Sequence, residues 1–277
     1  MMANLIDFLD AELQRDYNLP LSDVCKQEYN PDLTEQLQDI YPSLPNAGFK
    51  NFDLLATKEE LAALKSLKVE SINEYGYESA GHQYTAKHYE YTNYGSMDTL
   101  TGEVKDYLNL LSSENQIISG VVAKFVNKLV GSVMSSQNSE SALLFFRAYS
   151  PNNEPYLPRW HTDSCRFEGS VPILVTFKGA STLFYNASVE QREKFIDLQS
   201  QYLDDLDNIK LNVELSNIFT PYEGNFVATP SGSAFSCGDE QTGVLHTHPP
   251  VYEERIFLAI VPGGKSDIDL LYEEFEL

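Results

Sequence analysis

Apolar residues follow two different spacings along this chain. Between residues 103 and 136 they recur every three or four positions, which is the period of an amphipathic helix. The apolar positions of this stretch are Leu108, Leu111, Ile118, Val122, Phe125, Val126, Leu129 and Val133. We therefore expect a long helical stretch here, with its apolar face packed against a sheet.

The preceding segment contains one helix signal and one signal for extended structure. Thr57 is followed three positions later by Glu60, which is the pattern of a capping box, and alanine and leucine dominate the residues after it. Residues 79–96 are dense in tyrosine and threonine, which favours extended structure. Two histidines of this segment, His82 and His88, are expected in a loop or on a solvated face.

From residue 142 onward the apolar runs become short, and proline, glycine and asparagine separate them, as is typical of strands. The expected strand regions are 142–150, 158–167, 171–179, 181–186, 224–230, 233–237, 243–248 and 255–263. A helix interrupts them near 189–211, where Ser188 and Gln191 form a second capping-box pattern. Helices followed by many short strands predict an α+β architecture with a sandwich or barrel core.

Three regions follow from these patterns. Residues 1–140 are expected to be mainly helical or irregular and to pack on the core. Residues 141–265 are expected to contain the strand core, with the helical insertion near 189–211. Residues 266–277 form an acidic, amphipathic tail, which is expected to dock as a helix or to remain solvated.

Charge and composition narrow the classes of partner. The chain has 19 basic and 41 acidic residues, a formal net charge of −22, which disfavours nucleic acid and anionic lipid as partners. No run of apolar residues is long enough for a membrane span, and the N-terminus lacks the pattern of a secretion signal. The three cysteines are widely separated, which is typical of a reducing compartment, so we expect a soluble cytoplasmic protein.

Candidate chemistry begins with two residues in the expected strand 158–167. His161 and Asp163 are two positions apart, so in a strand both side chains point to one face and can bind one metal ion. This pair alone is a weak signal, because the pattern arises often by chance. His246 and His248 add histidines from a distant segment of a chain that has only five. Two histidines and one carboxylate leave three positions of an octahedral Fe(II) open, as in non-haem oxygenases.

The distal histidine ligand is either His246 or His248, since both would share one face of a strand. His246 is favoured because an apolar run precedes it, whereas His248 stands directly before two prolines, where a strand must end. His248 is then expected to face the substrate or to lie in an exposed loop. Arg255 begins a strongly apolar run, and a buried guanidinium needs an anionic partner. Such an anion is either a ligand or one of the neighbouring acids, for example Glu254.

Residues 142–263 resemble the Fe(II)/2-oxoglutarate-dependent dioxygenase superfamily. The resemblance lies in the order of His161, Asp163, His246 and Arg255, in "RAYSPNNEPYLPRWHTD", and in "FKGASTLFYN", which is similar to a glycine-rich turn of that family. It implies a double-stranded β-helix, also described as jelly-roll or cupin-like, in the C-terminal half, packed against the N-terminal helices. It further implies that the two histidines and the aspartate hold Fe(II), and that Arg255 binds the distal carboxylate of 2-oxoglutarate. O2 would then convert 2-oxoglutarate to succinate and CO2 while a substrate is hydroxylated.

The chain departs from the family pattern in two places. Phe257 stands two residues after Arg255, where the family commonly has a serine or threonine, so another residue must supply the second carboxylate contact. Tyr149, Thr176 and Lys178 are the candidates. The gap between His161 and His246 is 85 residues, which we attribute to the helical insertion.

The substrate class remains open between a small molecule and a protein side chain. Candidate substrate contacts are Arg147, Trp160, Arg166 and His248, although each of these is also compatible with a place in the core or an ion pair. Two other functions fit the same residues. One is a cupin-like metalloprotein that does not use 2-oxoglutarate, and the other is a non-catalytic β-barrel that binds a partner. Replacing Arg255 would distinguish the first of these from the oxygenase.

Overall fold

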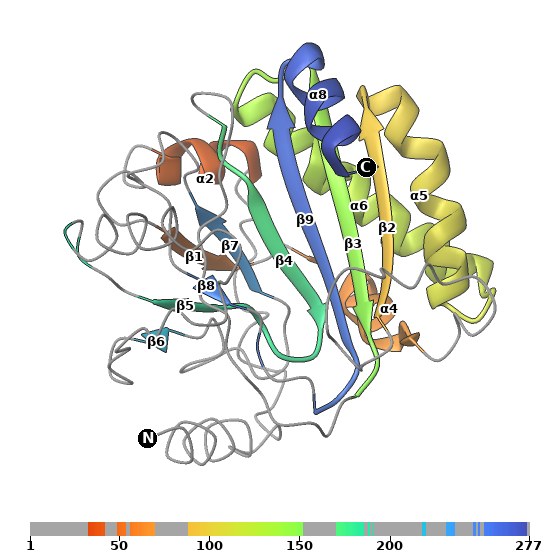
Figure 1. Ribbon diagram of the computed structural model, residues 1–277. Helices are drawn as coiled ribbons and strands as arrows, with labels where there is room; N and C mark the ends of the chain where they lie inside the picture. Colours follow the sequence, from red (N-terminus) through yellow and green to blue (C-terminus); the bar gives the residue numbers. More distant parts are fainter. Residues whose placement is uncertain are drawn as a thin grey trace.

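Two antiparallel sheets and a set of helices make up the fold in the computed structural model (Figure 1). The structure describes residues 33–41, 49–53, 56–69, 88–151, 170–185, 188, 190, 218–219, 231–235, 246–247, 249 and 252–275. The expected strands 158–167 and 224–230 and the helix expected near 189–211 lie outside the described residues, apart from Glu190, which is helical.

The larger sheet has six strands in the order β1-β7-β4-β9-β3-β2. Their bounds are β1 Phe49–Asp53, β7 Ser231–Phe235, β4 Ile173–Lys178, β9 Arg255–Gly263, β3 Ser141–Tyr149 and β2 His88–Gly95. The smaller sheet has the order β6-β5-β8, with β5 Leu183–Tyr185, β6 Ile218–Phe219 and β8 His246–Thr247. Every strand pair in both sheets is antiparallel. The strands expected at 142–150, 171–179, 181–186 and 255–263 are confirmed as β3, β4, β5 and β9.

The prediction of one long helical stretch between residues 103 and 136 is wrong in one respect, because these residues form parts of two helices. Helix α5 (Met97–Leu111) and helix α6 (Gln116–Ser136) are separated by a turn in which Ser113 and Glu114 have positive φ values of 54° and 61°. Asn115 caps α6, since its side-chain oxygen accepts hydrogen bonds from two backbone amides of the first turn. The turn lets α5 fold back alongside α6 on the same face of the sheet (Figure 1).

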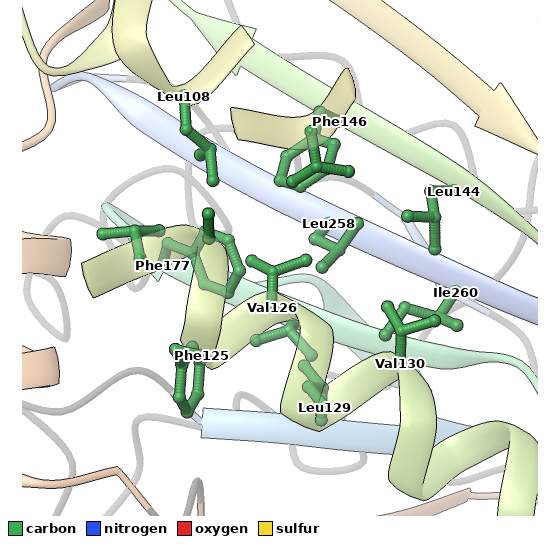
Figure 2. Packing of buried hydrophobic residues seen from close by; sticks show 14 of the residues in the cluster. Leu108, Phe125, Val126, Leu129, Val130, Leu144, Phe146, Phe177, Leu258 and Ile260 are labelled. Atoms are coloured by element: carbon green, nitrogen blue, oxygen red, sulfur yellow. The ribbon is translucent and has the colours of Figure 1, made fainter. Parts of the chain in front are cut away.

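The apolar face of α6 packs on the larger sheet, as expected. Figure 2 shows Val126 directed toward Leu258 and Val130 beside Ile260 of β9. By length and composition alone α6 could also cross a membrane, but nine of its residues are buried in this packing, so it is a core helix in this fold. Helices α2 (Leu33–Ile40) and α4 (Lys58–Ser66) pack against α6, and the capping box of Thr57 and Glu60 at the start of α4 is confirmed.

The opposite face of the larger sheet is covered differently at its two ends. Helix α8 (Lys265–Phe275), formed by the acidic tail, covers one end: Ile268 is fully buried and Tyr272 stacks on Tyr94 with ring centroids 4.0 Å apart. The other end of the same face carries Tyr149 and Arg255, which are direct partners in the β3–β9 register.

Two strands of the larger sheet come from residues 1–140, which we expected to be mainly helical or irregular, and β2 lies within residues 79–96, where we expected extended structure. Strand β1 pairs with β7 and strand β2 pairs with β3, so residues before 141 contribute to the same sheet as the strands after it. His88, expected in a loop or on a solvated face, begins β2 opposite Tyr149. Strand β3 pairs with β2 on one side and with β9 on the other.

Candidate functional site

Arg255 is a buried cation at the start of β9, with 2% of its surface exposed. Its Nε donates a hydrogen bond to the carbonyl oxygen of Ala180 at 2.9 Å, and its Nη2 donates to the hydroxyl oxygen of Thr182 at 3.1 Å. Both acceptors are uncharged and belong to the turn between β4 and β5. They fix the orientation of the guanidinium.

Two aromatic rings flank this guanidinium. Its central carbon lies 5.2 Å from the ring centroid of Tyr149 and 4.7 Å from that of Phe257, within the range of cation–π attraction. Phe257 stands where the family that the sequence resembles commonly has a serine or threonine. Here the hydroxyl at the guanidinium comes from Thr182 instead, and Phe257 contributes a ring face.

The turn that supplies these acceptors requires a glycine. Gly179 has a φ of +77°, and a Cβ at this position would collide with the carbonyl oxygen of Glu254 and lie 3.0 Å from the Cα of Arg255. Thr176, a candidate second carboxylate contact, is 1% exposed and donates its hydroxyl to Ser181 at 3.2 Å. Its side chain therefore contacts the turn.

His246 faces the same space from the smaller sheet. It is 5% exposed and pairs directly with Phe184 of β5, and the two ring centroids are 6.1 Å apart. Direct partners of an antiparallel pair share a face. Phe184 belongs to the apolar cluster that includes Phe145 and Phe257 on the larger sheet. The structure thus directs His246 and Arg255 into the space between the two sheets.

Lys178 has partners on the other side of the larger sheet. Its Nζ lies 2.7 Å from Oε2 of Glu254 and donates a hydrogen bond to the carbonyl oxygen of Leu67, also at 2.7 Å. A register irregularity between Thr176 and Lys178 pairs Lys178 with Ile256, whose side chain lies in the helix-covered core. The contacts of its ammonium group are therefore made on the side of α4, away from the space that contains Arg255.

Arg147 lies on the same face as Arg255, two residues before Tyr149. It is half-buried, and its guanidinium carbon lies 5.7 Å from the ring centroid of Phe145. It pairs directly with Phe257 in the register of β3 and β9. A role in substrate binding stays a prediction.

The remaining predicted site residues lie outside the described residues. They are Trp160, His161, Asp163, Arg166 and His248. Within the described part of the chain, no three histidine, cysteine, aspartate or glutamate side chains gather as a metal site. The metal triad and the choice between His246 and His248 therefore stay predictions.

Four contacts of Arg255 were not expected from the sequence: the Ala180 carbonyl, the Thr182 hydroxyl, the Phe257 ring and the close approach of Gly179. The segment "FKGASTLFYN" had marked this turn by its composition. Nothing in its letters indicates that it contacts a residue 75 positions later, because such a contact depends on the pairing of β4 with β9.

No protein-family profile and no curated protein sequence matches this chain. Among solved structures, it is similar to dioxygenase for auxin oxidation 1 from Arabidopsis thaliana, in a binary complex with 2-oxoglutarate, with 10% identity, 88% of this chain and 95% of that chain covered, and a TM-score of 0.47. A prolyl-4-hydroxylase from Pseudomonas putida has 10% identity, coverage of 84% and 99%, and a TM-score of 0.44. A prolyl hydroxylase from Trichoplax adhaerens, in complex with a peptide fragment of the hypoxia inducible factor oxygen degradation domain, has 12% identity, coverage of 92% and 98%, and a TM-score of 0.41. These TM-scores, all below 0.5, do not assign a family to the chain.

Proposed function

We propose that this chain is an Fe(II)- and 2-oxoglutarate-dependent oxygenase that hydroxylates a substrate and releases succinate and CO2. The observation that carries the proposal is the buried guanidinium of Arg255, oriented by Ala180 and Thr182 and directed into the same space as His246. A planar guanidinium held in one orientation suits a carboxylate ligand, which it can bind through two charge-assisted hydrogen bonds.

The order of strands supports a double-stranded β-helix. Along the chain, β3 and β4 belong to the larger sheet, β5 and β6 to the smaller, β7 to the larger, β8 to the smaller and β9 to the larger. Strands that alternate between two facing antiparallel sheets are the hallmark of a jelly roll. In that arrangement the expected strand 158–167, between β3 and β4, would join the smaller sheet beside β8.

This strand placement would bring His161 and Asp163 next to His246. The three side chains would hold Fe(II) as two histidines and one carboxylate and leave three positions for 2-oxoglutarate and O2. When bound, the iron supplies the redox chemistry that couples O2 to decarboxylation of 2-oxoglutarate and oxidation of a C–H bond. His246 fits this role because it is buried beside Phe184 and faces the space that Arg255 also faces.

The chain's own residues would bind and orient the cosubstrate. Arg255 would hold the carboxylate of 2-oxoglutarate that is remote from the metal, and Tyr149 and Phe257 would keep the guanidinium in place from either side. Phe257 and Phe184, which are buried in one apolar cluster, would also exclude water, which strengthens the charge interaction between the guanidinium and the carboxylate.

Binding of 2-oxoglutarate to the Mn(II)-loaded chain, measured by calorimetry without O2, tests this role of Arg255. Arg255→Lys keeps the charge but loses the planar fork, and a charge-assisted hydrogen bond is worth about 1.5–3 kcal/mol, so Kd should rise roughly 10- to 100-fold. Lys265→Met, which removes a lysine from an exposed ion pair of α8, is the control and should bind normally.

Three outcomes would count against the proposal. A wild-type chain that binds neither Mn(II) nor 2-oxoglutarate would rule it out. Binding of metal without 2-oxoglutarate would favour the cupin-like alternative. Unchanged succinate formation by His161→Ala, in an assay with Fe(II) and O2, would exclude the proposed ligand set.

A further inference from the structure

We infer that the Lys178–Glu254 ion pair positions the Arg255 guanidinium for carboxylate binding, and that the end of α4 holds this pair in place. The inference rests on the proposed function, in which Arg255 binds 2-oxoglutarate. Lys178 and Glu254 are thus positioning residues, whose contacts lie on the side of the sheet away from the cosubstrate.

The pair joins three segments of the chain. Lys178 Nζ lies 2.7 Å from Glu254 Oε2, and the two side chains are only 27% and 20% exposed, so solvent screens their attraction incompletely. The other carboxylate oxygen of Glu254 accepts a hydrogen bond from the backbone amide of Val69 at 3.0 Å. The ammonium of Lys178 donates to the Leu67 carbonyl oxygen at 2.7 Å. Leu67 and Val69, both buried, are the first and third residues after α4.

The ion pair and a hydrogen bond of the Arg255 guanidinium connect the same two segments of the chain. Glu254 directly precedes Arg255, and Lys178 is two residues before Ala180, whose carbonyl oxygen accepts the hydrogen bond from Arg255 Nε at 2.9 Å. The ion pair therefore links the same two backbone segments as the Arg255–Ala180 hydrogen bond, from the opposite side of the sheet.

Side-chain contacts matter here because the regular strand ladder ends at this point. The described register of β4 with β9 is irregular between Thr176 and Lys178 and stops at the pair Lys178–Ile256. Beyond it, Gly179 brings the turn against the backbone of Glu254 and Arg255. The ion pair holds residues 178–180 against residues 254–255 beyond the last regular pair of this ladder.

Two variants that each remove one charge distinguish a positioning role of the ion pair from a purely electrostatic effect on the bound anion. If Lys178 and Glu254 acted only through their charges, Glu254→Gln would remove a negative charge near the anion site and tighten 2-oxoglutarate binding. If they position Arg255, both Glu254→Gln and Lys178→Met weaken it, because bidentate binding is sensitive to small displacements.

The experiment measures Kd for 2-oxoglutarate with the Mn(II)-loaded full chain, and Kd for Mn(II) alone. Lys178→Met and Glu254→Gln should each raise the Kd of 2-oxoglutarate roughly tenfold, as is usual when a group supporting a ligand contact is lost, while the Kd of Mn(II) stays unchanged. Lys178→Arg, which keeps a cation opposite Glu254, should restore most of the affinity. Lys265→Met, which breaks an exposed ion pair with Asp269 of the same 2.7 Å length, should leave both constants unchanged.

Equal or tighter 2-oxoglutarate binding by Glu254→Gln would overturn the inference while leaving the proposed function intact. A wild-type chain that binds no 2-oxoglutarate would instead overturn the proposed function. In that case the exchange of the Arg255 Nε proton with solvent, followed by NMR, tests the positioning of Arg255 independently. The signal of this proton is assigned by its absence in Arg255→Lys. Roughly tenfold faster exchange in Lys178→Met, matching the expected loss of affinity, would support it, and unchanged exchange would overturn it.

Discussion

At the start of β9, neighbouring side chains point to opposite faces of the larger sheet and therefore make different contacts. Glu254 reaches Lys178 and the end of α4, Arg255 points into the space between the sheets, and Ile256 returns to the helix-covered core. A shift of one residue in register would exchange these environments and place the glutamate between the sheets. The contact of Gly179 with residues 254 and 255 is thus a condition for the site as well as for the fold.

Gly179→Ala should destabilise the protein by more than the roughly 1–2 kcal/mol that a left-handed backbone costs an L-residue, because the new Cβ also collides with the Glu254 carbonyl oxygen. Urea unfolding monitored by circular dichroism measures this change. Gly120→Ala is the matched control: a Cβ there meets nothing within 4 Å, and alanine should stabilise helix α6 by about 0.5–1 kcal/mol. Similar effects of the two substitutions would contradict this account of Gly179.

At the scale of elements, burial on both faces explains why β3 and β9 are almost continuously apolar. One face contacts α5 and α6, and the other contacts α8 and the cluster that includes Phe184. Helix α6 packs on the first face, and its Leu129 is fully buried in the core cluster. Ile117 in its first turn lies outside this packing, since it is 78% exposed.

Leu129→Ala should therefore lower the free energy of unfolding by about 2–5 kcal/mol, the usual cost of truncating a fully buried leucine. Ile117→Ala on the same helix should change it by less than about 0.5 kcal/mol, because an exposed side chain loses little contact. Chemical denaturation of both variants gives the comparison. Comparable losses would mean that α6 is packed by a different face.

The whole molecule carries a net charge of −22, and this charge acts on stability rather than on the choice of fold. Like charges repel one another across the surface of a compact protein, and the repulsion is relieved when the chain expands. Of the pairs Lys178–Glu254 and Lys265–Asp269, the first is substantially shielded from solvent and the second is exposed. The long-range repulsion is therefore the electrostatic effect most open to screening by salt.

Raising the salt concentration should accordingly raise the melting temperature. The screening length falls from about 30 Å at 0.01 M to about 8 Å at 0.15 M, which suppresses repulsion between distant carboxylates. Differential scanning fluorimetry in sodium chloride measures the shift. A melting temperature that falls over this range would show that attractive surface pairs outweigh the net charge.

Local patterns in the sequence were enough to identify several elements and the type of chemistry to look for. Helical spacing identified the face of α6, continuous apolar runs identified β3 and β9, and Thr57 with Glu60 identified the start of α4. Arg255 was recognisable as a buried cation, because an ionised residue at the head of an apolar strand stands out in the pattern. These features depend on residues close together in the chain.

The contacts between distant residues became known from the fold. It brought β1 and β2 into the larger sheet, placed Ala180 and Thr182 against Arg255, and turned Lys178 toward Glu254 and the end of α4. The physical reason is that periodicity records which face of an element is buried but not which strand pairs with it or in what register. A register shift beside Lys178 turned this side chain to the helix-covered face of the sheet, and no local sequence pattern predicts such a shift.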